Sequence, residues 1–469
     1  MLRNSFLVAA SVLILLMTGA ASAEKLVIQN VVIIDPAEAE PQPGMTVVVD
    51  GSRIEVVAKT TAGEVWGAAR VIDGSGKYLI PGLWDMHVHL RDLGNTLPLF
   101  VVNGVTGVRD MGSEIAKTQA LKAAIAAGTV LGPRIKSAGL MLESRSWLEQ
   151  YVEIMRQSAP EAEVQRFLKT RLAVEDAEDA GAAISSLLES GSDFIKIRHA
   201  PSKEAFLAIA AAARQRGVQL TGHYVWNVEL IDVSNSGQAS IEHNILPGFN
   251  ERDSQEKQRI FDALVRNRTH WVPTLVAAEV ETTAFDDLRE QVEDRKGERD
   301  NRMRYVSPQI YRGWLETIEM NEHDKERPPV EVIREMVDGS NQFLRDAREA
   351  GVLMMAGTDA PTTGVFFGFS LHDELRLLVD RYGFTPREAL HSATTVPVRF
   401  LGLEDELGSI QKGKVADLLL LKADPFDDIS NTRAIDAVIY SGRVYDEAAL
   451  QAILDEIAAG INETAPKGE

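Results

Sequence analysis

The chain has 469 residues, of which 45% are hydrophobic and 25% are charged, a composition typical of a globular protein and not of a disordered or fibrous one. Its formal net charge of −20 repels phosphate backbones, so a nucleic-acid partner is not expected. The sequence contains no cysteine, which excludes disulfide bonds and leaves nitrogen and oxygen as the ligands for any metal ion.

Residues 1–23 have the pattern of a cleaved secretory signal peptide. Arg3 supplies the positive charge, an apolar core covers residues 6–17, and Ala21-Ser22-Ala23 provides a small-residue cleavage site. The apolar core is short for a bilayer about 30 Å thick, and no later segment is a candidate span. We therefore expect a secreted or periplasmic protein with no stable membrane anchor.

Residues 24–80 are predicted to form short strands. Apolar runs at 26–28, 31–34, 45–49 and 54–57 are separated by turn residues, and Asp50-Gly51 is a hairpin signal between two of them. This segment is expected to be the N-terminal part of a small β-sandwich.

The next stretch, Pro81-Gly82-Leu83-Trp84-Asp85-Met86-His87-Val88-His89-Leu90, ends an apolar run with two histidines. Side chains alternate along a strand, so His87 and His89 point to the same side. Neutral imidazole is a common zinc ligand, but two histidines do not complete a site. The remaining ligands must come from elsewhere in the chain.

Residues 81–403 alternate apolar strands with alanine-rich helical runs. After the histidine pair, strands are expected at 104–111, 134–140, 193–198, 218–224, 239–244, 270–275 and 352–359. Helices are expected at 115–127, 177–190, 203–216 and 330–349. Eight such strands predict an α/β fold, a (β/α)8 TIM barrel with its catalytic residues at the C-terminal strand ends. A doubly wound sheet is the alternative, but no glycine-rich nucleotide turn follows an early strand.

Two charged stretches, 144–176 and 250–329, are longer than ordinary connections. Their composition is compatible with solvated surface helices or with a lid over the barrel mouth, and both alternatives stay open.

Residues 404–446 become strand-like again, at 408–410, 416–421, 437–440 and 443–445. Because this segment and residues 24–80 flank the barrel, we expect 404–446 to complete the sandwich. Residues 447–469 are predicted to be a helix followed by a tail.

Six candidate metal ligands lie at the ends of the predicted barrel strands. They are His87, His89, Lys196, His223, His243 and Asp359. Taken singly, each has another explanation: a core histidine, a surface lysine, or a helix N-cap for the aspartate. Their common position at one end of the barrel favours a metal site.

The motifs around these residues resemble those of the metal-dependent amidohydrolase superfamily, nearest to its imidazolonepropionase-like branch with the prolidase-like dipeptidases. The similar segments are residues 81–89, Phe194-Ile195-Lys196-Ile197, Ile241-Glu242-His243, Gly357-Thr358-Asp359-Ala360, Ser392-Ala393-Thr394-Thr395 and residues 407–417. They extend over nearly the whole chain after residue 23.

This resemblance implies a hydrolase with two divalent metal ions, and zinc is the expected metal. It places His87, His89 and Asp359 on one metal and His223 and His243 on the other, with a carboxylated Lys196 between them. Asp359 is the implied catalytic residue. The implied substrate is a small molecule with an amide bond, a dipeptide or an N-acyl amino acid, and homo-oligomer formation stays open.

The fifth strand departs from the branch's common His-Ala-Tyr-Gly. This chain has His223-Tyr224-Val225-Trp226, which moves the tyrosine by one place. Tyr224 is therefore a candidate substrate residue at a position that differs from that of the branch. Arg198 and His199, just beyond Lys196, are candidate ligands for a substrate carboxylate, and a surface salt bridge is the alternative for both.

Two other functions stay open. A cyclic-amide or lactone hydrolase would use the same scaffold, because loops select the leaving group. A non-catalytic binding protein would keep the barrel without its ligands, but all six ligand positions are occupied by suitable residues.

Overall fold

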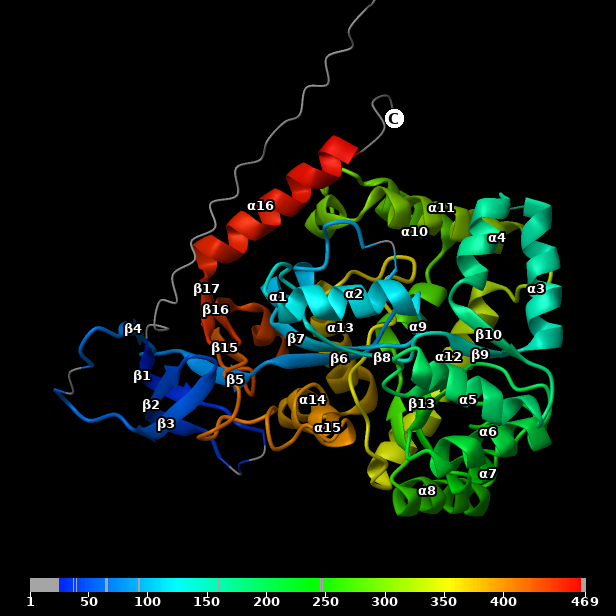
Figure 1. The fold of residues 1–469 in the computed structure, drawn as a ribbon, viewed down its shortest axis with the longest axis horizontal. Coiled ribbons are helices and arrows are strands. Elements are labelled where there is room, and N and C mark those ends of the chain that lie inside the picture. Colours follow the sequence, from blue (N-terminus) through cyan, green and yellow to red (C-terminus); the bar gives the residue numbers. More distant parts are fainter. Residues whose placement is uncertain are drawn as a thin grey trace, which may run out of the picture.

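The structure is a computed structural model that describes residues 25–464 except 37, 39, 64, 65, 92, 159, 245 and 247. The expected signal peptide, residues 1–23, and the expected tail after residue 464 lie outside the described residues. Strands from both ends of the chain share one sheet, which lies beside a larger body of parallel strands and helices (Figure 1).

The terminal sheet contains strands from residues 24–80 and from residues 404–446. Its order is β17-β16-β15-β5-β1-β2-β3, and β4 pairs with β1. The strands are β1 (Leu26–Ile33), β2 (Gln42–Asp50), β3 (Arg53–Lys59), β4 (Arg70–Asp73), β5 (Tyr78–Pro81), β15 (Leu418–Leu421), β16 (Ile435–Tyr440) and β17 (Arg443–Asp446). β15 and β5 join the two segments in antiparallel register, Leu419 opposite Ile80.

One face of this sheet encloses its own apolar core. Alternate residues of several strands meet there, among them Ile28, Val47, Leu418 and Ile439. Burial of every second residue is expected for strands that pack on one face.

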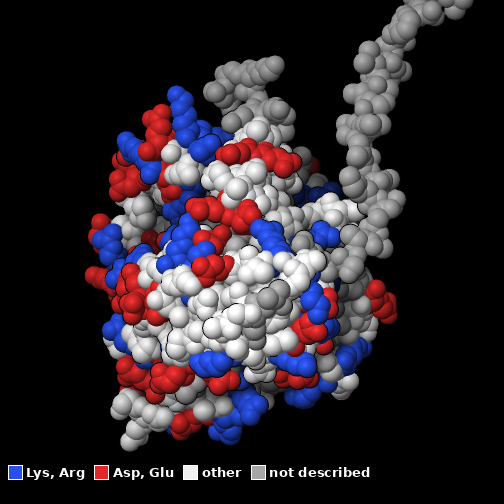
Figure 2. Space-filling view, turned by 90° about the vertical axis from the view of Figure 1, so that its left-hand side faces the viewer, with Lys and Arg blue, Asp and Glu red and all other residues white. Residues whose placement is uncertain are grey.

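The side of the molecule that carries the sheet shows both signs of charge around an uncharged area (Figure 2). The expected return of the C-terminal segment is thus observed, but as one mixed sheet. The run 408–410 is not a strand, because Gly408 has φ +79° and packs against Val398.

The parallel strands of the main body form two ladders. One has the order β6-β7-β8 and the other β10-β9-β11-β12-β13-β14. The strands are β6 (Leu83–Val88), β7 (Val105–Asp110), β8 (Arg134–Ser137), β9 (Met141–Ser144), β10 (Arg171–Val174), β11 (Ile195–Ile197), β12 (Leu220–His223), β13 (Gln238–Glu242) and β14 (His270–Val272). β6, β7 and β11 are buried along their whole length, as expected for strands covered on both faces.

The expected eighth strand, 352–359, is not a regular strand. This segment makes only isolated bridges, Met354 with Trp271 of β14 and Ala360 with Val88 of β6. Its backbone turns into the left-handed region at Asp359, φ +61°, where a strand cannot continue. The α/β fold is therefore observed, whereas a continuous closed barrel is not seen in the described part of the chain.

Helices surround the parallel strands (Figure 1). They are α1 (Leu99–Val102), α2 (Ile115–Ala126), α3 (Arg145–Ser158), α4 (Glu161–Leu168), α5 (Asp179–Glu189), α6 (Lys203–Gln215), α7 (Leu230–Asn235), α8 (Ser254–Asn267), α9 (Leu275–Glu281), α10 (Phe285–Glu293), η1 (Asn301–Tyr305), α11 (Pro308–His323), α12 (Val330–Glu349), α13 (Phe369–Tyr382), α14 (Pro386–Ser392), α15 (Thr395–Phe400), η2 (Ile429–Arg433) and α16 (Glu447–Thr464). Across the residues that the structure describes, no helix is both long and apolar enough to cross a membrane.

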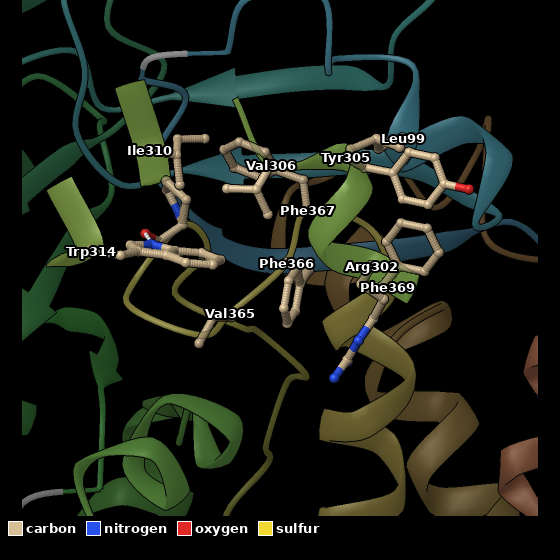
Figure 3. A pocket seen from close by; sticks show the side chains of 11 residues that line it. Leu99, Arg302, Tyr305, Val306, Ile310, Trp314, Val365, Phe366, Phe367 and Phe369 are labelled. Atoms are coloured by element: carbon tan, nitrogen blue, oxygen red, sulfur yellow. Dashed lines mark hydrogen bonds between the residues drawn. The ribbon is translucent and has the colours of Figure 1, made fainter. Parts of the chain in front are cut away.

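The long segment 250–329 packs on the loop that carries Asp359. Trp314 of α11 donates its Nε1–H to the Pro361 carbonyl at 2.9 Å, and its ring meets Phe366 edge-on. Together with Ile310 they line a small apolar cavity of about 10 Å³ (Figure 3). That volume holds at most one water molecule, so the contact is a packed one. α11 is therefore more than a solvated surface helix, and its opening as a lid stays a prediction.

Glu374 is a fully buried carboxyl group on α13. It accepts the backbone N–H of Val276, 2.8 Å away at the start of α9, and burial raises its pKa to about 8. The unfolded chain releases this proton near pH 4.5, so the folded state binds one more proton between pH 4.5 and 8. The contribution of Glu374 to stability therefore falls as the pH rises through this window.

We expect Glu374→Gln to flatten the decrease in the free energy of unfolding between pH 5 and pH 8, because the neutral amide replaces the neutral acid. Urea unfolding at several pH values measures this slope. Glu349→Gln, an exposed residue on α12, is the control and should keep the wild-type slope. An unchanged slope in Glu374→Gln would mean that Glu374 is ionised in the folded state.

Candidate metal centre

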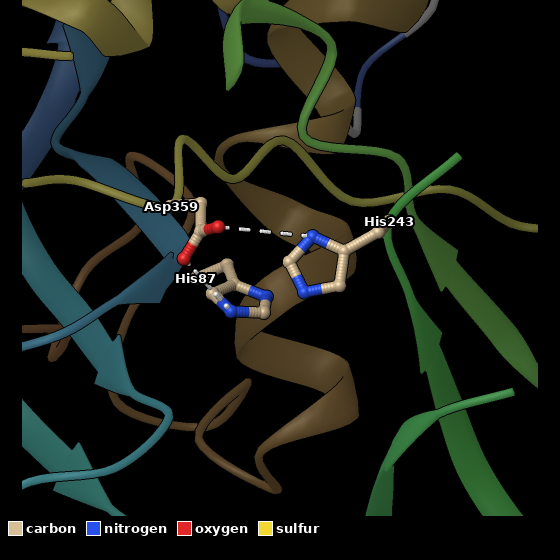
Figure 4. Close-up of side chains that lie close together, drawn as sticks. All are labelled: His87, His243 and Asp359. Atoms are coloured by element: carbon tan, nitrogen blue, oxygen red, sulfur yellow. Dashed lines mark ion pairs between the residues drawn. The ribbon is translucent and has the colours of Figure 1, made fainter. Parts of the chain in front are cut away.

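Three of the expected ligands converge at the C-terminal ends of the strands. One ligand atom each from His87, His243 and Asp359 lies within 4.8 Å of the others. Asp359 Oδ1 is 3.4 Å from His87 Nε2, and Oδ2 is 3.9 Å from His243 Nδ1 (Figure 4). These separations are suited to a cation held between a carboxylate and two imidazoles.

The other two histidines border this group. His89 Nε2 is 3.2 Å from Asp359 Oδ1, and the His223 ring centroid is 4.8 Å from that of His243. The rings of His87 and His243 are 4.6 Å apart. His89 therefore lies beside Asp359, and His223 lies beside His243.

The buried histidines are held neutral. Burial, then the nearby charge of Lys196, lowers the pKa of His87 and of His223 well below the usual range. Burial also lowers the pKa of His243 to about 4. Burial alone would raise the pKa of Asp359, but the surrounding histidines outweigh it and hold that pKa well below its usual range. Neutral imidazoles and an ionised carboxylate are the forms that bind metals.

Lys196 lies on β11 with its side chain almost completely buried. Burial lowers its pKa to about 8, although Glu242 and Asp359 oppose the shift. About a tenth of the side chain is then free amine at pH 7, compared with well under a hundredth at the ordinary pKa of 10.5. A free amine is the form that can react with carbon dioxide to give a carbamate, whose oxygens can bind metal.

His87 provides a direct test of whether this site fits a metal. Its Nδ1 is 2.9 Å from Glu242 Oε2, while its buried Nε2 has no hydrogen-bond partner among the described residues. His89 is arranged similarly, with Nδ1 3.0 Å from the Gly112 carbonyl. Hydrogen bonding through one ring nitrogen leaves the other free as a ligand, which is the usual arrangement around metals. The residues therefore fit a divalent cation.

Glu242 and Arg109 are functional candidates that sequence reasoning missed. Arg109 of β7 donates from Nη2 to both Glu242 oxygens at 2.8 Å, and from Nε to the Met86 carbonyl at 2.7 Å. All of these groups are buried, so the pair fixes the carboxylate that orients His87. The charged pair Arg109-Asp110 at the end of the otherwise uncharged strand β7 was the available signal for Arg109.

Asp85 links β6 to the segment that carries Asp359. It accepts hydrogen bonds from the Thr358 amide at 3.0 Å, the Thr358 hydroxyl at 2.7 Å and the His87 amide at 3.2 Å. Next to it, a Cβ on Gly357 would lie 2.8 Å from the His87 amide nitrogen, so only glycine allows this close approach. These contacts position Asp359 against the histidines.

The two candidate substrate residues lie in different surroundings. Arg198 follows β11 and donates from Nη1 to Glu143 Oε1 at 3.2 Å, while His199 Nδ1 is 2.8 Å from Glu143 Oε2. The ring contacts of Tyr224 within the described residues are with Phe249 and Trp226. The structure thus brings Arg198 near Lys196 and His223, whereas the ring contacts of Tyr224 within the described residues are with none of the six ligand candidates.

Comparison with known proteins adds a family match. A family model described as "Amidohydrolase family" matches residues 78–445. Two curated relatives are a dihydroorotase of Trichlorobacter lovleyi, 39% identical over 82 residues, and an imidazolonepropionase of Rubrobacter xylanophilus, 43% identical over 75 residues. These matches cover 17% and 16% of this chain and only 18% of each relative.

Solved structures match over most of the chain. A putative prolidase from Bifidobacterium longum is 27% identical, with a TM-score of 0.67, over 93% of this chain and 99% of that one. A Xaa-Pro dipeptidase with bound methionine is 23% identical, with a TM-score of 0.67, over 90% and 100%. Phenylurea hydrolase B is 22% identical, with a TM-score of 0.69, over 92% and 98%. The last two share the fold with this chain.

Proposed function

Because this chain belongs to the amidohydrolase family, we propose that it is a secreted or periplasmic hydrolase that uses two divalent metal ions to cleave the amide bond of a dipeptide or an N-acyl amino acid. The observation that carries the proposal is the convergence of His87, His243 and Asp359, with the buried Nε2 of His87 left free for a ligand. The prolidase and dipeptidase names among the solved structures support the substrate class.

In this proposal His87, His89 and Asp359 would hold one metal ion and His223 and His243 the other, and Lys196, once carboxylated, would supply carbamate oxygens as further ligands. Zinc is the proposed metal, because the donors are nitrogen and oxygen. Bound there, the metals would lower the pKa of a water molecule and polarise the scissile carbonyl. Asp359 accepts the proton of the attacking water and passes it to the leaving nitrogen. Arg109 and Glu242 keep His87 in its ligand orientation.

The domain division is part of the same proposal. Residues 24–80 and 404–446 make up a small domain around the one mixed sheet, and residues 81–403 make up a (β/α)8 barrel. The helix α16 follows the small domain, and residues 1–23 are the proposed signal peptide. The bridges of residues 354 and 360 to β14 and β6 support the barrel, since they connect the two ladders. The signal-peptide pattern supports export.

A second candidate is hydrolysis of a cyclic amide or a lactone at the same site. The curated relatives carry other enzyme names, dihydroorotase and imidazolonepropionase, than the solved structures do. The same metals and the same Asp359 would serve either reaction, so the difference lies in which substrates bind.

We expect the purified protein to contain close to two divalent metal ions per chain and to hydrolyse members of a panel of dipeptides and N-acyl amino acids faster than lactones. Elemental analysis and the panel, run in parallel, check this. His323→Gln, an exposed histidine on α11, should keep the metal content, whereas His87→Gln should lose metal. Active protein without metal would disprove the proposal, and faster lactone turnover would favour the second candidate.

A further inference from the structure

A second group of charged side chains borders the metal centre around Glu143. Glu143 is the third residue of β9, and its side chain is completely buried. Arg198 and His199 bind its two oxygens at 3.2 and 2.8 Å, and Arg171 Nε of β10 is 3.7 Å from Oε1. One carboxylate is thus shared by two guanidinium groups and an imidazole.

Arg171 is incompletely satisfied in this group. Its Nη1 donates to the Phe167 carbonyl at 3.1 Å and to the Thr170 hydroxyl, and its guanidinium lies 3.6 Å from the Phe167 ring centroid. Its buried Nε has no hydrogen-bond partner among the described residues. Burial, then the nearby charge of Arg198, lowers the pKa of Arg171 to about 9. Glu143 is thus one carboxylate that faces two guanidinium groups, at 3.7 Å from Arg171 and 3.2 Å from Arg198.

Trp147 of α3 holds the second arginine in place. The Arg198 guanidinium lies 4.6 Å from the Trp147 ring centroid, and the His199 ring stacks on the same tryptophan at 4.4 Å. Tyr151 stacks on Trp147 at 4.9 Å. The segment 144–176 therefore builds one wall of the group, which restricts Arg198 and lowers the entropy lost on binding.

The charged group around Glu143 lies next to the candidate metal centre. Arg198 is two residues beyond Lys196, and the His199 ring centroid is 6.2 Å from that of His223. Two guanidinium groups against one carboxylate leave an excess positive charge beside the metal ligands. A half-buried excess charge is stabilised by an anion, and arginine forks match a carboxylate in particular.

Resting on the proposed function, we propose that Arg171 and Arg198 bind the free carboxylate of the substrate, with Trp147 as a positioning residue. The substrate class is then an amide whose leaving amine or acyl part carries a carboxylate. The orientation places that carboxylate on the His223 side of the metal centre. Neutral amides and lactones lack the group that these arginines bind.

The test compares matched acids and neutral analogues. A panel of N-acetyl amino acids and dipeptides, each paired with its C-terminal carboxamide, is assayed for hydrolysis and for binding by titration calorimetry. We expect the wild type to prefer the acids by about 10²-fold, in line with the loss of hydrogen bonds to a charged group. Arg171→Gln and Arg198→Gln should each reduce kcat/KM for the acids by about 10- to 10²-fold and reduce kcat/KM for the carboxamides by a much smaller factor.

Arg156→Gln is the matched control. Arg156 lies on α3, the helix that carries Trp147, but it forms an exposed ion pair with Glu161. It should match the wild type. Trp147→Leu should raise KM for the acids with kcat retained, a split that a purely structural residue would not produce. Arg171→Lys keeps the positive charge and replaces Arg171→Gln in the test if the glutamine variant does not fold. It should retain part of the preference for acids over carboxamides.

Equal use of acids and carboxamides by the wild type, binding of neither, or equal losses for both in the arginine variants would overturn the proposal. In the last case the arginines only anchor the segment 144–176. Preference for neutral amides or lactones by a metal-containing enzyme would overturn this subsite and leave the metal hydrolase standing. Acid-selective binding by a metal-free, inactive protein would support the carboxylate subsite and overturn the proposed metal hydrolase.

Discussion

Lys196→Ala is expected to lose bound metal and to reduce turnover by at least about 10²-fold, the upper range for residues that only support metal ligands. The reason is the position of Lys196, buried on β11 and near enough to His87 and His223 for its charge to lower the pKa of both, with its own pKa lowered by burial to about 8. Alanine removes the amine that would carry the carbamate. Elemental analysis and steady-state kinetics measure the two losses.

Two further variants separate a carbamate from a structural lysine. Lys196→Arg should also fail, because guanidinium does not carboxylate. Acetate or propionate should partly restore metal content and activity to Lys196→Ala by replacing the carbamate oxygens. Lys203→Ala is the control, since Lys203 is exposed and pairs with Asp232 on the surface. Wild-type activity in Lys196→Ala or Lys196→Arg would show that Lys196 has no role in the metal site.

A measurement on the wild type is independent of activity. Protein prepared with ¹³C-labelled bicarbonate should show a carbamate carbon that is absent from Lys196→Ala. This result would assign the modification to one side chain. A labelled carbon that persists in the variant would place the carbamate elsewhere.

The elements that position the site were largely predictable because they repeat a local pattern. Apolar strands with polar ends recur along the chain, and His87, Lys196 and His223 stand where each strand ends. The family match confirms the resemblance drawn from these motifs. Helices such as 330–349 were predicted within a residue or two, because their apolar periodicity is local.

The parts that were not predictable depend on contacts between distant segments. Glu242 and Arg109 are 133 residues apart in sequence, and only the topology brings them together behind His87. Glu143 and Arg198 are another such pair, from β9 and the end of β11. Composition likewise predicted helices in 250–329 without indicating that Trp314 packs on the Asp359 loop. The prediction of an eighth strand at 352–359 was wrong because this segment makes only an isolated bridge at Met354 and, just beyond its end, another at Ala360, which an alternating pattern does not reveal.

The backbone of Asp359 also makes its proton-transfer role testable. Its φ of +61° is unfavourable for most residues but is tolerated by asparagine about as well as by aspartate. Asp359→Asn therefore introduces little additional strain, unlike replacement by alanine. The amide oxygen can still approach His87 and His89, which lie 3.4 and 3.2 Å from Oδ1 in the native carboxylate.

Asp359→Asn is thus expected to keep the fold and part of the metal while turnover falls by at least about 10²-fold, the low end for lost acid–base catalysis. An amide cannot take up the proton of the attacking water at neutral pH, so the chemical step fails although the substrate still binds. KM for the preferred substrate should change little compared with kcat. Metal analysis, thermal unfolding and single-turnover kinetics on the same preparation measure the bound metal, the fold and the turnover.

Asp380→Asn, which removes an exposed carboxylate paired with Arg376, should behave as the wild type. Wild-type kcat in Asp359→Asn with both metals bound would require the proton to travel through another group, and the proposed role of Asp359 as proton carrier would be wrong.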